Sequence, residues 1–245
     1  KDAVLVADLS HVNRDLCYLP VDASEELLHL AVRRLVRGLE LPTDRIMSLP
    51  WDFTLRENVR ALRRLLDDLF GQTPVLFSLL GNTIAHLDAD TEALELIATE
   101  LLRPGDRLLL EVEATSGLGD GLAAMAADEH ARSTVFGEFV TSALRHHTDL
   151  DAEPAGVELH GTVEGDRALL VKTMYRADED FTITLPNQST VRFAFDDTIR
   201  LALSRKYTPE GLAAMLADTG LTIVGDVCTT ADDPFGIALL MLEVS

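Results

Sequence analysis

The loop from Gly81 to His86 contains the residues whose types and position could do chemistry. An apolar run, 74–80, is typical of a buried strand, and it ends at a glycine followed by small polar residues and a histidine. In an open α/β sheet, ligands bind where strands end and loops begin. A histidine can exchange a proton near neutral pH. We therefore expect a ligand site at this loop, with His86 as a candidate catalytic proton acceptor. The alternative is a structural histidine that caps the helix at 89–102 or packs against the sheet.

Apolar periodicity predicts the elements that must position this loop. Apolar residues at helical spacing predict helices, and short apolar runs bounded by turn residues predict strands. The first half of the chain contains predicted strands at 16–21, 46–49, 74–80 and 107–113, with predicted helices at 24–36, 54–69 and 89–102. Alternating strands and helices imply a parallel sheet.

The pattern changes after Glu113. The predicted elements are helical structure at 117–147, antiparallel strands at 157–163, 168–174, 181–185 and 190–195, a helix beginning at 208, and a final antiparallel hairpin of 221–227 and 235–244. We therefore expect residues 115–206 to form an insertion or cap on the substrate side. Residues 1–114 and 207–245 would form the main domain.

The composition argues against several classes of protein. A formal net charge of −20 argues against a nucleic-acid partner, because phosphate binding needs clustered lysine and arginine. No segment approaches the ~20 apolar residues of a membrane span, and the chain starts without signal-peptide architecture, so we expect a cytoplasmic protein. Cys17 and Cys228 lie in apolar runs, which favours buried, reduced thiols over a disulfide. No side chains at metal-ligand spacing stand out, so no metal is expected.

The start of the chain departs from the usual order of a nucleotide-binding domain. Such a domain opens with a strand, a glycine-rich loop and a helix, and an acidic residue follows about 20 positions later. Asp22 ends an apolar run, but no glycine-rich loop precedes it, and residues 1–9 look like the helix that follows such a loop. Because a parallel sheet without its first strand would expose the neighbouring strands, we expect the native polypeptide to have residues upstream.

Five short motifs occur in order along nearly the whole chain. They are Tyr18-Leu19-Pro20-Val21-Asp22-Ala23-Ser24, Trp51-Asp52-Phe53, Leu80-Gly81-Asn82-Thr83-Ile84, Leu102-Arg103-Pro104-Gly105-Asp106 and Ser204-Arg205-Lys206-Tyr207. Together they resemble the histidine-specific family of S-adenosylmethionine-dependent methyltransferases. The resemblance implies an α/β, Rossmann-like class I methyltransferase sheet, mostly parallel with an antiparallel final strand. It also implies S-adenosylmethionine as cofactor and S-adenosylhomocysteine as product.

The resemblance implies a cofactor site. Lys1 matches the lysine that closes the family's glycine loop near the methionine carboxylate. Asp22 matches the acidic residue that accepts hydrogen bonds from both ribose hydroxyls. Asp52 and Phe53 match the pair at the adenine, and Gly81 lies where the backbone approaches the ligand closely. For both aspartates, an ordinary helix-cap or turn carboxylate is the alternative.

The expected substrate site departs from the family. Ala85-His86 stands where the family has Gly-Asn, whose asparagine grips the substrate's α-amino and carboxylate groups, and Ala202 replaces the glutamate that holds the imidazole. Ser204 is retained. We expect Asn82, His86 and Ser204 at the substrate. Because unpaired buried polar groups are costly, these changes predict a small amine or amino-acid derivative other than free histidine.

The expected reaction is direct displacement at the sulfonium methyl, with the acceptor nitrogen neutral and in line. A role in specialised metabolism would suit the altered substrate residues. Two alternatives remain open: a catalytically silent, methyltransferase-like binding or assembly subunit, and an NAD-dependent oxidoreductase, since Asp22 would suit a ribose in either fold.

Overall fold

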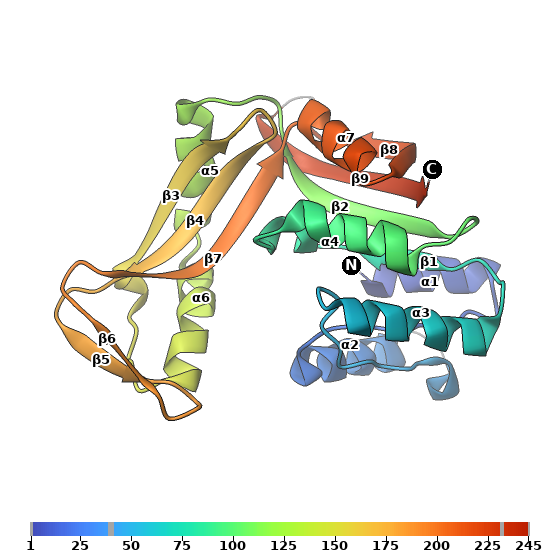
Figure 1. Cartoon of the computed structure of the whole chain (residues 1–245), viewed down its shortest axis with the longest axis horizontal. Helices are drawn as coiled ribbons and strands as arrows, with labels where there is room; N and C mark the ends of the chain where they lie inside the picture. The colour runs from blue at the N-terminus through green and yellow to red at the C-terminus, as the bar shows by residue number, and fades with distance from the viewer. Residues whose placement is uncertain (1, 39–41, 231–232, 245) are drawn as a thin grey trace.

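A mixed seven-stranded sheet runs through the molecule. The computed structural model describes residues 2–38, 42–230 and 233–244. The strands are β1 (Leu76–Leu79), β2 (Arg107–Thr115), β3 (Val157–Glu164), β4 (Ala168–Arg176), β7 (Thr198–Tyr207), β8 (Leu221–Cys228) and β9 (Phe235–Val244), and they lie in the order β3-β4-β7-β2-β9-β8 with β1 beside β2. β1 and β2 are parallel, and β9 and β8 add the predicted antiparallel hairpin. The expected Rossmann-like α/β fold is confirmed, with antiparallel strands 157–176 joined to it (Figure 1).

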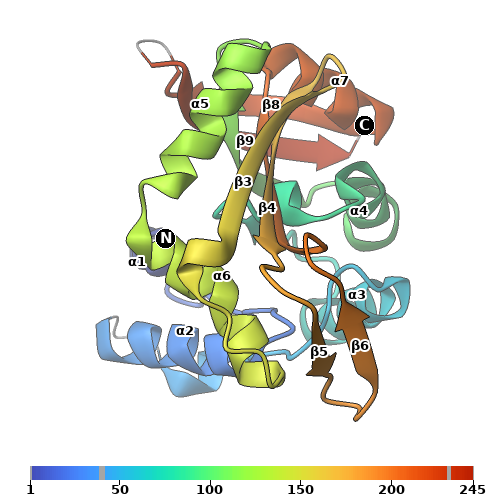
Figure 2. The same cartoon turned by 90° about the vertical axis from the view of Figure 1, so that its left-hand side faces the viewer.

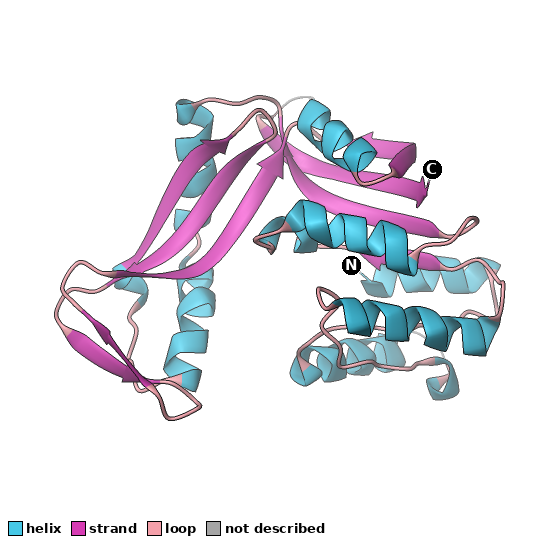
Figure 3. Ribbon diagram, viewed as in Figure 1, coloured by secondary structure: helices cyan, strands magenta, loops and turns pink. Residues whose placement is uncertain are grey.

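Seven helices accompany the sheet in the described residues. They are α1 (Asp2–Val12), α2 (Glu25–Gly38), α3 (Arg56–Phe70), α4 (Asp90–Leu96), which continues as a π-helical turn (Ile97–Leu101), α5 (Asp120–Ala131), α6 (Thr134–His147) and α7 (Pro209–Asp218). A separate two-stranded hairpin is formed by β5 (Phe181–Thr184) and β6 (Thr190–Phe193). Figure 3 distinguishes the helices from the strands. Along the chain α1, α2 and α3 precede β1, so the predicted alternation begins only at β1. No described helix is long and apolar enough to cross a membrane.

The core around β2 follows from its alternating apolar residues. Leu108, Leu110 and Val112 are buried on one face of the strand, where they pack in a single cluster with residues of α3, α4 and α7. Asp106 ends the Pro-Gly turn before β2. Its carboxylate accepts a hydrogen bond, at 2.8 Å, from the backbone N–H of Val75, the residue that precedes β1. Asp106 therefore ties the start of β2 to the start of β1.

β2 and β7 share only one residue pair, Ala114 with Tyr207. From this point, which we call the fork, the strands β7, β4 and β3 diverge from β1, β2, β9 and β8, as Figure 1 shows. We call residues 115–206 the insert and the other described residues the body. In the insert, α5 packs closely on β3, since a Cβ on Gly161 would lie 1.8 Å from the carbonyl oxygen of Ala123 (Figure 2).

Three sequence predictions need correction. No strand was expected at 198–207, but this segment is β7, because its Arg205 and Lys206 are buried with carboxylate partners from other elements. The expected strands at 16–21 and 46–49 are reduced to two isolated parallel bridges, Tyr18 with Ile46 and Val21 with Leu49. Cys17 and Cys228 are free, as expected, but both are exposed rather than buried, because Cys17 lies in a loop just before the bridge at Tyr18 and Cys228 ends the exposed edge strand β8.

Candidate active site at the fork

The loop 81–86 lies in the fork, and Asn82 ties it to both diverging strands. The side chain of Asn82 is 5% exposed. Its Nδ2 donates to Ser204 Oγ at 3.1 Å and to the carbonyl oxygen of Arg205 at 3.4 Å, while its Oδ1 accepts from the backbone N–H of Glu113 at 2.9 Å. Asn82 adopts the left-handed conformation, with φ at 65°. The structure thus brings together Asn82 and Ser204, two residues expected at the substrate.

His86 is exposed, and a backbone carbonyl orients its ring. Nδ1 lies 2.8 Å from the carbonyl oxygen of Leu203 in β7. A carbonyl can only accept, so in the neutral ring Nδ1 carries the hydrogen and Nε2 carries the lone pair. Nε2 has no hydrogen-bond partner among the described residues. The arrangement therefore leaves a proton-accepting nitrogen beside the fork.

A buried arginine holds the backbone on both sides of His86. Arg205 is 4% exposed, and its Nη1 donates to the carbonyl oxygens of Leu87 at 2.6 Å and Ala85 at 3.5 Å. On its other side, Nε and Nη2 donate to the two carboxylate oxygens of Glu164 at 2.8 and 3.1 Å. Burial alone would raise the pKa of Glu164, but the bonds and charge of the neighbouring guanidinium groups outweigh it and hold this pKa below its usual value.

A second buried group joins α4 to the insert. Asp90 is nearly inaccessible, and its carboxylate accepts from the hydroxyl of Tyr207 at 2.6 Å and pairs with Arg167 at 3.1 Å. Burial, followed by the charge of Asp90, raises the pKa of Tyr207 far above its usual range. Because Arg167 belongs to the insert and Tyr207 lies at the fork, the cluster fixes the insert against the body at this point.

Lys206 forms a third polar cluster on the opposite face of β7. The side chain is 3% exposed, and its Nζ lies 2.8 Å from Glu113 Oε2 and 3.0 Å from Glu129 Oε2. The ammonium group also lies 4.9 Å from the ring centroid of Phe235. Sequence reasoning assigned no role to this lysine or to Arg205, although the alternation of residues 199–207 was a signal for a strand with two different faces.

The expected cofactor aspartates use one oxygen each for a local turn. Asp22 Oδ1 accepts from the backbone N–H of Ser24 at 2.8 Å, and Asp52 Oδ1 accepts from the backbone N–H of Thr54 at 2.8 Å. Both Oδ2 atoms have no hydrogen-bond partner among the described residues. The turn role considered from the sequence is therefore present, and it leaves an acceptor oxygen on each carboxylate. Lys1 lies outside the described residues.

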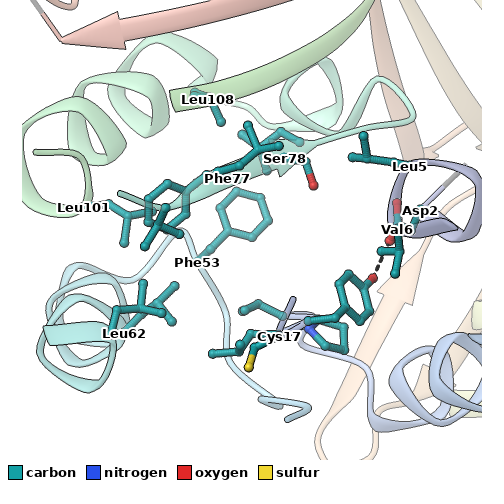
Figure 4. Close-up of a pocket in the computed structure, with 18 of the residues that line it drawn as sticks. Asp2, Leu5, Val6, Cys17, Phe53, Leu62, Phe77, Ser78, Leu101 and Leu108 are labelled. Carbon is teal, nitrogen blue, oxygen red and sulfur yellow. Dashed lines mark hydrogen bonds between the residues drawn. The ribbon is translucent and has the colours of Figure 1, made fainter. Parts of the chain in front are cut away.

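A cavity of about 500 Å³ lies between β1 and the bridged segment 18–21. Its lining combines apolar side chains such as Leu62 and Leu101 with Phe53 and Asp22. Figure 4 shows Phe53 beside Phe77 within it. Of the expected cofactor residues, Asp22 and Phe53 thus line one cavity, while Asp52 and Gly81 lie beside residues that do. Its volume is within the range of small-molecule sites, and its aromatic ring and carboxylate suit a nucleoside.

Other candidate side chains do not assemble into a site. His146 and His147 are exposed and touch each other edge to face, and His160 pairs with Glu158 at 3.3 Å on the surface. Among the described residues, no group of three or more histidine, cysteine, aspartate or glutamate side chains could hold a metal ion.

Comparisons with known proteins identify the family. The model of the histidine-specific, S-adenosylmethionine-dependent methyltransferases matches residues 1–242. Among solved structures, the chain is similar to an S-adenosylmethionine-dependent methyltransferase from Clostridium acetobutylicum, with 9% identity, a TM-score of 0.42 and coverage of 99% of this chain and 90% of that one. It is also similar to the glycopeptide N-methyltransferase MtfA complexed with S-adenosylmethionine, with 15% identity, a TM-score of 0.38 and coverage of 94% and 87%.

A further similar structure is the 1,6-didemethyltoxoflavin-N1-methyltransferase of Burkholderia thailandensis, with 11% identity, a TM-score of 0.38 and coverage of 99% of this chain and 78% of that one. No curated protein matches. The family match spans nearly the whole chain and favours a methyltransferase over the oxidoreductase considered from the sequence. The chain belongs to the histidine-specific family of S-adenosylmethionine-dependent methyltransferases, and it is therefore an enzyme whose cofactor is S-adenosylmethionine.

Proposed function

We propose that the enzyme methylates the nitrogen of a small amine or amino-acid derivative other than free histidine. The observation that carries this proposal is the ring of His86, whose Nδ1 is bound to the carbonyl of Leu203 while Nε2 is left to accept a proton. An amine is largely protonated at neutral pH and has no lone pair until it loses a proton. A proton acceptor beside the fork is therefore what an amine acceptor needs.

The chemistry follows from this placement. S-adenosylmethionine, when bound, supplies a methyl group on a positively charged sulfur. His86 Nε2 takes one proton from the substrate's ammonium group, which frees the nitrogen lone pair. Asp22, Asp52 and Phe53 would hold the cofactor, whose methyl group would pass to the freed lone pair with the carbon–sulfur bonding electrons left on sulfur. Positioning supplies most of the rate enhancement in such a displacement.

Two positions support an acceptor other than free histidine. The family's asparagine that grips the amino acid is replaced by His86, and the carboxylate that holds the imidazole is replaced by Ala202. Ala202 lies opposite Thr173 of β4, which is itself buried. A methyl side chain cannot accept a hydrogen bond from an imidazole, so free histidine would leave its ring nitrogen unpaired. The net charge of −20 is compatible with a cationic acceptor.

We also propose roles for the expected cofactor residues. Asp22 would accept from the ribose hydroxyls through Oδ2, while Asp52 and Phe53 would hold the adenine, the first through its free oxygen and the second through its ring. Gly81 would let the backbone approach the ligand, and the role of Lys1 rests on the family resemblance alone. In this proposal the body binds the cofactor, and the insert forms the substrate side of the site.

The test is methyl transfer from radiolabelled S-adenosylmethionine to tryptamine, histamine, L-tryptophan and L-histidine, with products identified by mass spectrometry. We expect an amine of this panel to be methylated at least tenfold faster than L-histidine. His86→Ala should lower kcat about 100-fold, the lower range for a proton-transfer group, without changing the Kd of S-adenosylmethionine. His160→Ala, at an exposed histidine of β3, is the matched control. L-histidine as the best acceptor, or full activity of His86→Ala, would contradict the proposal.

A further inference from the structure

β7 has one edge that no strand covers beside the loop. β4 pairs with one edge of β7 through Leu203, Ser204 and Arg205, whereas β2 meets the other edge only at Tyr207. Backbone carbonyls on this second edge still need donors, because unpaired buried polar groups are costly. The side chain of Asn82 donates to the carbonyl of Arg205, and the ring of His86 is bound to the carbonyl of Leu203.

Both side chains can reach this edge only if the backbone between and after them stays in place. Arg205 supplies that constraint, because its guanidinium group donates to the carbonyls of Ala85 and Leu87, which flank His86, and to that of Asp88 at 3.4 Å. A single side chain therefore binds backbone carbonyls on both sides of the histidine.

Arg205 is itself held from the far side. Glu164 binds it through both carboxylate oxygens, and Asp90 lies 3.6 Å from its Nε. Arg167 also pairs with both carboxylates, so moving the guanidinium group of Arg205 away would leave them one cation between them and would break the bidentate pair with Glu164. The clamp on the loop is thus anchored in the insert through Glu164 and in the body through Asp90.

We propose that Arg205 is a positioning residue that sets the proton-accepting state of His86. With the flanking carbonyls held, Nδ1 of the ring is directed at the carbonyl of Leu203 and must carry the hydrogen, so Nε2 accepts. Once the clamp is lost, the ring rotates and exchanges between its two neutral tautomers, and the accepting nitrogen is no longer fixed. This inference rests on the proton-acceptor role proposed for His86.

The test reads the tautomer directly and needs no methyl acceptor. Two-bond proton–nitrogen NMR spectra of protein labelled with ¹⁵N in its histidine rings distinguish hydrogen on Nδ1 from hydrogen on Nε2 in the neutral ring. His86→Gln assigns the signal. The perturbation is Arg205→Lys, which keeps the charge but cannot reach Glu164 and the carbonyls together. Arg200→Lys is the matched control, because Arg200 lies on the same strand and bonds to the exposed carboxylate of Asp88.

We expect the wild type and Arg200→Lys to show His86 with hydrogen on Nδ1 alone, and Arg205→Lys to show a mixture of tautomers. Glu164→Gln, which weakens the anchor of the clamp, should shift the ring in the same direction and carries the test if Arg205→Lys does not fold. A ring that keeps its hydrogen on Nδ1 in the folded clamp variants would overturn the inference, as would a mixture in the wild type.

Kinetics separate this inference from the proposed function. With an amine that the wild type methylates, Arg205→Lys should lower kcat about 10- to 100-fold, the range for a misplaced catalytic group. The double variant His86→Ala/Arg205→Lys should then be no slower than His86→Ala alone. Additive losses would overturn the positioning role and leave the role of His86 standing. Full activity of His86→Ala would refute the proposed proton transfer, and with it this inference.

Discussion

Replacing Asn82 with alanine is expected to lower the free energy of unfolding by about 4 kcal/mol. The hydrogen bond to Ser204 Oγ is a neutral one between buried groups, and such a bond contributes about 1 kcal/mol. The backbone N–H of Glu113 would lose its acceptor, which costs about 2 kcal/mol for a desolvated donor. The remaining loss, about 1 kcal/mol, comes from removing the amide group that lets an asparagine tolerate the left-handed conformation, which an alanine tolerates poorly.

Urea unfolding followed by circular dichroism measures this loss, with Gln188→Ala as the matched control. Gln188 has a φ of 66°, nearly that of Asn82, but its side chain is exposed and has no hydrogen-bond partner among the described residues. The control should lose less than about 1 kcal/mol, because only the backbone conformation is shared. Equal losses for the two variants would refute the reasoning. A large loss of activity with unchanged stability would instead mark Asn82 as a residue that only contacts substrate.

Three further outcomes are expected. Asp22→Asn should weaken binding of S-adenosylmethionine about tenfold, as measured by calorimetry, because a charge-assisted hydrogen bond to the ribose is lost. The turn hydrogen bond through Oδ1 remains in this variant. An unchanged Kd would contradict the ribose role. The pKa of Glu164 is lower in the folded protein than its ordinary value of 4.5, so ionised Glu164 stabilises the fold at pH values above 4.5. This stabilisation is lost as the pH falls through the pKa of the folded state. In thermal melts at acidic pH, Glu164→Gln should therefore lose stability less steeply than the wild type. Gly161→Ala should destabilise the fold by about 3 kcal/mol, because the new Cβ meets the backbone of Ala123. The control Gly121→Ala, whose Cβ meets nothing within 4 Å, should be neutral or stabilising. Similar thermal shifts for both variants would contradict the packing of α5 on β3.

The fold of the body could be predicted largely from local pattern. The strand at 107–113 and the helix at 54–69 correspond to β2 and α3, because their apolar spacing and turn residues are set within the segment itself. β7 could not be recognised so easily. Its Arg205 and Lys206 resemble surface residues in the sequence, and only the structure shows that carboxylates from distant elements surround them.

The position of the loop 81–86 could be predicted from the sequence, but its long-range contacts could not. The break after the strand at 74–80 correctly placed a loop at the end of β1, and the retained Ser204 does contact Asn82. The partner of His86 is a carbonyl 117 residues away in the chain, and Arg205 meets that same loop from a similar distance. No local sequence pattern indicates such pairings, because histidine and arginine side chains are also common on solvent-exposed surfaces.

The single residue pair at the fork also affects how relatives of this enzyme can diverge. Because the insert leaves the body after Ala114 and returns to it at the adjacent Tyr207, its two ends lie side by side. Residues added to or removed from the insert do not change the spacing of β1, β2, β9 and β8. Evolution can therefore lengthen or shorten this segment away from its contacts with the body while the order of those four strands is inherited unchanged.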